Sequence, residues 1–158
     1  MLGIAYIFGV FKLSLISFLF ILPYRTFSGG FHLHTHIGCI VFTCLMYSGN
    51  AVLSKYIVIG KISKYILIAI TWIFGMIMCK IYAPADTEEA PILVKKERKL
   101  KQRMSYLTLT IELALAIFIN NPIVSNIIIF GIIIQTITIS RIAYKLTKSK
   151  YGHEVYAN

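Results

Sequence analysis

The stretch YILIAITWIFGMIMCKIY, residues 65–82, decides the fold class, because it carries a single charge, Lys80, in a long apolar run. A membrane-spanning helix needs roughly 20 mostly apolar residues. Four further apolar runs flank this stretch, at residues 2–22, 37–53, 104–119 and 123–139. Backbone groups in lipid must pair within their own segment, so each run is predicted to be a helix. The sequence therefore predicts one domain over residues 1–158, an all-α, polytopic membrane helical bundle with about five transmembrane helices.

The composition agrees with a membrane location. The chain has 158 residues, of which 58% are hydrophobic and 14% are charged, and its mean hydropathy is +0.77. A soluble domain has about a quarter of its residues charged. The formal net charge is +10, but the basic residues lie between apolar runs rather than on a polar surface. This arrangement is typical of a membrane protein and excludes nucleic acid as the expected partner.

The basic residues also predict which side of the membrane each loop faces. Residues 95–103 carry six positive charges and one negative charge, and further basic residues follow in the tail at 141–158. Because basic loops stay in the cytoplasm, we place the loop 83–105 and the tail there. Counting back across the spans puts residues 23–36 on the same side. The same counting leaves Met1 outside, so we expect the native protein to have a preceding N-terminal membrane segment.

The polar segment between the first two runs is the candidate site. It reads PYRTFSGGFHLHTHIGC over residues 23–39, and its loop, 23–38, is predicted to be catalytic. The sharpest interpretation pairs His32 with Cys39 as a nucleophilic dyad, because a nearby imidazole increases the thiolate fraction of a thiol. Arg25 is a candidate for binding a carboxylate. The Gly29-Gly30 pair is expected to let backbone N–H groups approach a developing oxyanion.

Helix geometry sets a condition on this dyad. Seven residues of straight helix turn through about 700° and rise about 10.5 Å, so the two side chains would share a face but lie far apart. A general base must lie within roughly 3 Å of the proton that it takes. The dyad therefore requires the chain to fold back, with Gly29, Gly30 and Gly38 permitting the bend. An unbroken helix from residue 30 to 45 would exclude it.

Two other interpretations of the histidines stay open. His32, His34 and His36 could bind a transition metal, since imidazole is a common ligand, although alternate spacing suits a strand and no acidic residue is adjacent. Alternatively, the interfacial His and Gly residues only close a loop. A metal- or partner-binding loop would belong to a non-enzymatic small membrane transporter or assembly factor. With the dyad as the preferred interpretation, we expect neither a metal nor a cofactor.

Two blocks of this sequence resemble the accessory gene regulator B (AgrB) family of Gram-positive quorum sensing. The first block has its motif residues at Arg25, Gly30, His32 and Cys39. The second reads YAPADTE over residues 82–88, followed by Pro91, Ile92 and the basic run. The resemblance extends from residue 20 to residue 145.

The resemblance implies an integral membrane cysteine endopeptidase, a thiol protease in the bacterial cell membrane with several spans. Such enzymes remove the C-terminal tail of a small AgrD-like peptide precursor and close a thiolactone or lactone ring in the remainder. Carried onto this chain, the nucleophile would be Cys39 and its base His32, with Arg25 and Gly30 as supporting positions. We expect the family's additional N-terminal membrane segment to be missing from this sequence, so a truncated relative that inserts but cannot cleave is a further alternative.

Two acidic residues and two further cysteines have competing interpretations. Asp86 would orient His32 as the third member of a triad, or it forms a structural salt bridge to nearby Arg or Lys residues. Glu112 lies within an apolar run, so it is a candidate site residue or an interfacial residue that reaches the headgroups. Cys44 and Cys79 are expected to contribute to packing only.

The basic run and the substrate suggest the partners. Residues 95–103 are expected to bind anionic lipid headgroups, or to hold the acidic tail of a peptide substrate. The precursor is expected to arrive as an amphipathic helix lying in the membrane interface. A homodimer is compatible with a small polytopic protein, although no heptad or GxxxG pattern specifies one.

Overall fold

The computed structural model describes residues 9–33 and 35–156, and this part of the chain is all-α, as predicted. Its helices run in the order α2 (Phe11–Ser28), α3 (His36–Tyr56), α4 (Lys61–Tyr82), α5 (Lys95–Phe118), α6 (Pro122–Thr138), α7 (Arg141–Leu146) and α8 (Gly152–Tyr156). The N-terminal part of the first predicted span, residues 2–8, lies outside the described residues.

Among the described residues, α3 and α4 are long and apolar enough to cross a membrane, and α6 is apolar but shorter. Large apolar side chains stay exposed along α4, among them Ile66, Ile70 and Ile73. Its buried side is a stripe that includes the small Gly75, where an added Cβ would lie 2.8 Å from the Leu109 side chain of α5. An apolar outer surface and close helix packing at a small residue are typical of membrane bundles. The full count of five spans remains a prediction.

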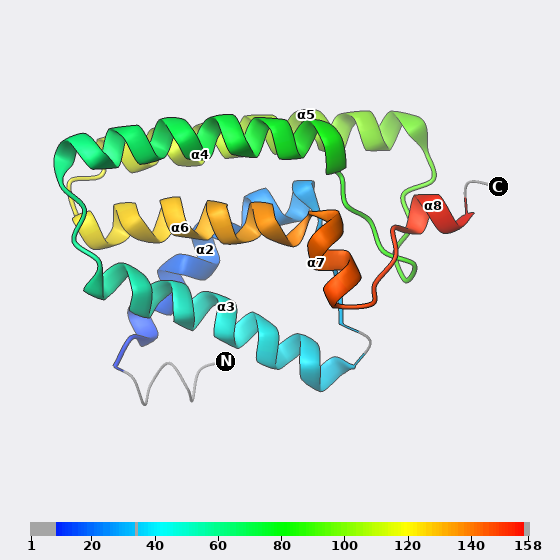
Figure 1. Cartoon of the computed structure of the whole chain (residues 1–158), viewed down its shortest axis with the longest axis horizontal. Helices are drawn as coiled ribbons and strands as arrows, with labels where there is room; N and C mark the ends of the chain where they lie inside the picture. Colours follow the sequence, from blue (N-terminus) through cyan, green and yellow to red (C-terminus); the bar gives the residue numbers. More distant parts are fainter. Residues whose placement is uncertain (1–8, 34, 157–158) are drawn as a thin grey trace.

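Helix α6 lies at the centre of the bundle, in contact with α2, α3, α4 and α5 (Figure 1). It begins as the sequence predicts, because the Asn121 side chain accepts hydrogen bonds from the N–H groups of Ile123 and Val124. Pro122 occupies the first turn, where its missing N–H costs nothing. Most of the helix is then buried, including the polar Gln135.

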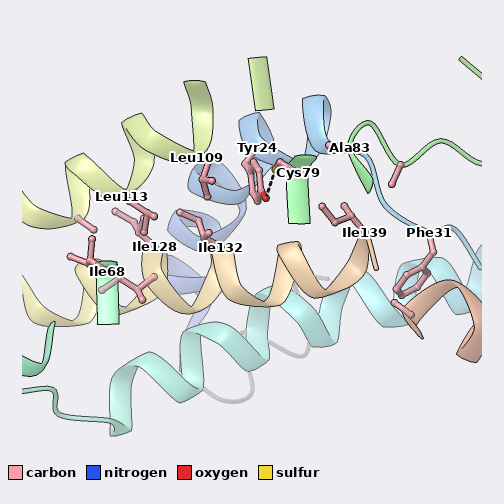
Figure 2. Close-up of a cluster of buried hydrophobic side chains, with 14 of the residues drawn as sticks. Tyr24, Phe31, Ile68, Cys79, Ala83, Leu109, Leu113, Ile128, Ile132 and Ile139 are labelled. Carbon is pink, nitrogen blue, oxygen red and sulfur yellow. Dashed lines mark hydrogen bonds between the residues drawn. The ribbon is translucent and has the colours of Figure 1, made fainter. Parts of the chain in front are cut away.

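Polar side chains connect the helices inside this apolar bundle. The Tyr24 hydroxyl of α2 lies 3.2 Å from the Cys79 sulfur of α4 and 3.1 Å from the Thr136 hydroxyl of α6. Figure 2 shows Tyr24 pointing toward Cys79 across the buried cluster. On the other side of α6, Asn50 of α3 donates to the Ser17 hydroxyl at 2.9 Å. Such bonds pair groups that lipid could not satisfy, so they help to set how the helices face one another.

The predicted end of the first span is wrong, because α2 continues through Pro23 to Ser28. A proline removes one helical hydrogen bond, which a neighbouring helix or a polar side chain can compensate. Here the residues after Pro23 are held by α6, through Tyr24 and Arg25. The predicted loop 23–38 therefore contracts to residues 29–35.

The segments predicted as the loop 83–105 and the tail 141–158 are also more helical than expected. Helix α5 begins at Lys95, so the basic run forms its first turns. Lys, Glu, Arg, Gln and Leu are good helix formers, and Glu97 pairs with Lys101 one turn later at 3.2 Å. The tail contains α7 and α8.

Three connecting segments meet at one end of the bundle, around residues 29–35, 83–94 and 139–156 (Figure 1). They are the segments that the charge pattern assigns to one side of the membrane. The connection between α3 and α4 lies at the opposite end of the bundle (Figure 1). The candidate residues Arg25, Gly30, His32, Cys39 and Asp86 belong to these segments or to the helix turns next to them, whereas Glu112 lies within α5.

Candidate active site

His32 and Cys39 lie close together. His32 belongs to the loop 29–35, whereas Cys39 lies in the first turn of α3. The imidazole Nδ1 is 3.8 Å from the Cys39 Sγ. Thr35 separates the two elements, because its side chain accepts a hydrogen bond from the Gly38 N–H at 3.2 Å and so caps α3. The helix is thus interrupted between residues 30 and 45, as the dyad requires.

The chain turns at Gly29 and Gly30, whose φ angles are +74° and +144°. L-residues rarely adopt either conformation. A Cβ on Gly29 would overlap the backbone carbonyl of Ala85, so glycine is needed here for close approach as well as for conformation. The third expected bend position, Gly38, instead lies within α3.

The N–H groups of Gly29 and Gly30, which were expected beside a developing oxyanion, are both paired within the protein. The Gly29 N–H donates to the Arg25 carbonyl at 2.9 Å, and the Gly30 N–H donates to the Ala85 carbonyl at 2.9 Å. Ala85 in turn donates its N–H to the Ser28 carbonyl at 2.8 Å. Both glycine N–H groups are therefore occupied: the Gly29 N–H ends α2, and the Gly30 N–H joins the turn to the segment after α4.

Arg25 and Gln135 hold this turn from inside. The Arg25 guanidinium donates to the Gln135 side-chain oxygen at 3.0 Å and to the Phe31 carbonyl at 3.4 Å. The Gln135 amide then donates to the Gly29 carbonyl at 2.7 Å. A Cβ on Gly30 would lie 3.2 Å from Arg25, so Gly30 leaves room for the guanidinium. Gln135 was not among the site residues predicted from the sequence, although an amide within an apolar run, which also holds Asn126, was a visible signal.

A groove with a volume of about 330 Å³ opens beside His32. Its polar lining includes Arg25 and Lys101, and the bend at Gly29 and Gly30 forms part of its wall. Phe27, Pro84 and Ile92 are among its apolar lining residues. The groove is therefore lined by two basic residues, the acidic Asp86 and apolar surface, beside His32 of the dyad.

The surroundings of His32 favour its neutral form. Partial desolvation lowers the pKa of its imidazole, and the Arg25 charge lowers it further, whereas the Glu89 charge acts in the opposite direction. The net effect places the pKa below the ordinary value of 6.5. A neutral imidazole at pH 7 can accept a proton, as a general base must.

Asp86 is buried, and its carboxylate is held by two other segments. One oxygen accepts from the His153 ring Nδ1 at 2.6 Å, and the other accepts from the Ile92 N–H at 3.0 Å and lies 3.3 Å from the Arg98 guanidinium. Burial raises the pKa of this carboxyl, but these contacts outweigh it, so the pKa lies below its usual range. The structure thus places Asp86 in a salt bridge with the basic run, and its carboxylate contacts do not include His32.

The C-terminal segment packs over the loops that carry Asp86 and His32. This contact was not predicted from the sequence. The Tyr144 hydroxyl donates to the Asp86 carbonyl at 3.0 Å, and its ring stacks on Tyr151 with centroids 4.0 Å apart. Ser149 donates its hydroxyl to the His32 carbonyl at 2.7 Å. Only a polar, partly aromatic composition marked this tail in the sequence.

The remaining candidates lie apart from the dyad. Within the residues that the structure describes, no group of three or more His, Cys, Asp or Glu side chains could hold a metal ion, and His34 lies outside them. Glu112 is only 5% exposed and lines an apolar pocket of about 260 Å³ with Pro23, so it is buried rather than interfacial. Cys44 and Cys79 are both buried.

The family model described as Accessory gene regulator B matches residues 1–139. The chain belongs to the accessory gene regulator B family. It is therefore a membrane protein of the agr quorum-sensing system.

Curated relatives of this AgrB-family chain cover most of its length. A putative AgrB-like protein of Listeria monocytogenes serotype 4a is 26% identical over 155 residues, which are 98% of this chain and 74% of the relative. A putative AgrB-like protein of Clostridium acetobutylicum is 27% identical over 94% of this chain and 69% of its own length. The accessory gene regulator protein B of Staphylococcus intermedius is 29% identical over 87% of this chain and 70% of its own length. No solved structure matches significantly.

Proposed function

We propose that this AgrB-family chain is a cysteine endopeptidase of the bacterial cell membrane. It would remove the C-terminal tail of an AgrD-like propeptide and close the remainder into a thiolactone or lactone ring by acyl transfer. The observation that carries the proposal is the 3.8 Å separation between His32 Nδ1 and Cys39 Sγ, at a bend that interrupts the helix. An imidazole beside a thiol is the arrangement that activates a cysteine nucleophile.

The first step cleaves the peptide bond. His32 takes the thiol proton of Cys39 as the sulfur attacks the scissile carbonyl carbon, forming an S–C bond and a tetrahedral oxyanion. The oxyanion collapses, the C–N bond breaks, and the imidazolium of His32 gives its proton to the leaving amine. The N-terminal part of the peptide then remains on Cys39 as a thioester.

The second step closes the ring. A thiol or hydroxyl within the bound peptide attacks the thioester carbonyl, and His32 takes its proton. The new S–C or O–C bond forms, the bond to Cys39 breaks, and the leaving sulfur regains a proton from His32. Exchange of one thioester for another changes the free energy little, whereas hydrolysis would lose the activation. A site at the membrane surface helps to exclude water during this step.

The oxyanion needs donors other than Gly29 and Gly30, whose N–H groups are occupied. We assign this role to the first-turn N–H groups of α3, at His36 and Ile37. First-turn N–H groups lack intrahelical acceptors in any helix, and the helix dipole there favours negative charge. Their position next to Cys39 in the same turn supports the assignment.

The groove beside His32 is the proposed binding site for the peptide. Its volume of about 330 Å³ and its mixed lining suit a short extended segment with apolar and acidic side chains. Arg25 and Lys101 supply the positive charge. The exposed Lys95 and Lys96 at the start of α5 are assigned to anionic lipid headgroups.

Coexpression with an AgrD-like precursor tests this function. Cys39→Ala should abolish cleavage while the protein accumulates normally in the membrane. Cys44→Ala is the matched control, because it removes a thiol from the same helix without touching the dyad, and it should retain cleavage. Acid quenching of the wild type should reveal a thioester adduct of the peptide on Cys39. Cleavage by the Cys39→Ala protein would overturn the proposal.

A further inference from the structure

The backbone of His32 is anchored on both sides. The preceding N–H, at Phe31, donates to the Thr138 carbonyl at the end of α6 at 3.4 Å, and the Phe31 side chain is buried. The His32 carbonyl itself accepts the Ser149 hydroxyl at 2.7 Å. The ring, in contrast, is exposed and has one described hydrogen-bond partner, Cys39.

We propose that Ser149 is a positioning residue for His32, so that the C-terminal segment is part of the active site. This inference rests on the proposed function. In many enzymes a carboxylate that binds the second ring nitrogen orients the catalytic imidazole. Asp86 does not orient the His32 ring in this way, because its carboxylate is held by His153, Ile92 and Arg98. The hydrogen bond from Ser149 holds the backbone of His32 instead.

Ser149 can hold the His32 backbone in place because the segment around Ser149 is itself held independently of His32. Four residues later, His153 binds the Asp86 carboxylate through its backbone N–H at 2.9 Å and through its ring. On the other side of Ser149, Tyr144 donates to the Asp86 carbonyl, and its own carbonyl accepts the Ser149 N–H at 3.0 Å. Gly152 lies so close to Pro91 that an added Cβ would be 2.9 Å from it. The segment is therefore docked on the loop after α4 at several points.

The expected effect is on proton transfer rather than on folding. A displacement of about 1 Å in a catalytic group can cost about 100-fold in rate. Ser149 is only partly buried, so its replacement should leave the bundle intact. Without its hydroxyl, the His32 backbone would lose one of its two anchors, and the ring would spend less time near Cys39.

Alkylation of Cys39 by iodoacetamide, followed by mass spectrometry in detergent, tests this without any peptide substrate. The alkylation rate reports how readily the thiol gives up its proton. We expect Ser149→Ala and Ser149→Val to slow alkylation by about three- to tenfold at pH 7, consistent with a small displacement of the base. Ser149→Thr keeps the hydroxyl and should react at the wild-type rate. Ser63→Ala, on the exposed surface of α4, is the control.

A double-variant comparison then separates the outcomes. His32→Ala should slow alkylation, and adding Ser149→Ala to it should slow it no further, because Ser149 acts through His32. Equal rates for the Thr and Val variants, or additive losses in the double variant, would overturn the positioning role. An unchanged rate for His32→Ala would instead contradict the proposed function, because the base itself would then have no effect on the thiol.

Discussion

Gly29 and Ala85 form a parallel backbone bridge that joins the end of α2 to the segment after α4. Both bridge residues line the groove, and the bridge holds the turn that carries His32. Its hydrogen bonds run from Gly30 to Ala85 and from Ala85 to Ser28, at 2.9 and 2.8 Å. The position of the dyad thus depends on contact between two loops that are far apart in the sequence.

Replacement of Gly29 by alanine should disrupt this bridge. The new Cβ would overlap the Ala85 carbonyl, and the residue would have to adopt a φ of +74°. Strained backbone of this kind costs about 1–3 kcal/mol, before the steric overlap is counted. We expect lower thermal stability in detergent and loss of precursor cleavage. Gly49→Ala in α3, where an added Cβ meets nothing within 4 Å, should leave both properties unchanged.

Replacement of His32 by glutamine should lower the cleavage rate by about 10²–10⁴-fold, because this is the usual contribution of a general base. The precursor should still bind, so the loss should appear in kcat. His36→Gln is the matched control at the start of α3, and we expect it to be tolerated. An equal loss in both variants would favour the metal-binding interpretation of the histidines.

The cleavage rate should fall on the acidic side of pH 6.5. The pKa of His32 lies below its ordinary value of 6.5, so the imidazole is neutral and able to accept a proton above that range. As the pH falls through the pKa, the ring becomes charged and the base is lost. The Glu89 charge raises this pKa, so Glu89→Gln should move the acidic limb of the pH–rate profile to lower pH. A shift in the opposite direction would contradict the assignment.

Asp86→Asn should destabilise the site end of the bundle. The variant loses the charge on a buried group that binds His153 and Arg98, and hydrogen bonds to charged groups contribute about 1.5–3 kcal/mol each. Because the folded-state pKa lies below the ordinary value of 3.8, this stabilisation is present above pH 3.8 and is lost as the pH falls through the lower value. Thermal unfolding of the wild type and of Asp86→Asn in detergent at several pH values would measure this difference in stability.

Glu88→Gln provides the control for that experiment. Glu88 pairs with Lys150 at 3.4 Å, but both side chains are exposed to solvent. Surface pairs of this kind contribute about 0–1 kcal/mol, so this variant should unfold close to the wild-type temperature. If Glu88→Gln lowered the unfolding temperature as much as Asp86→Asn, the buried network around Asp86 would have no special role in docking the C-terminal segment.

Hydropathy predicted the helices better than it predicted their ends. The apolar runs at 37–53, 65–82 and 123–139 each lie within a few residues of a helix in the structure. The first apolar run ends at Leu22, yet α2 continues past Pro23, because α6 holds the residues that follow. Helix ends depend on such tertiary partners, which a local pattern does not contain.

The sequence by itself determined an all-α bundle and the residue types of a cysteine–histidine pair, because apolar runs and side-chain chemistry are local properties. Only the tertiary structure decided that His32 reaches Cys39, that Asp86 binds His153 and that the glycine N–H groups are already occupied. Each of these depends on contacts between segments distant in the chain. The distances between these paired residues follow from how helices and loops pack, and not from their spacing along the sequence.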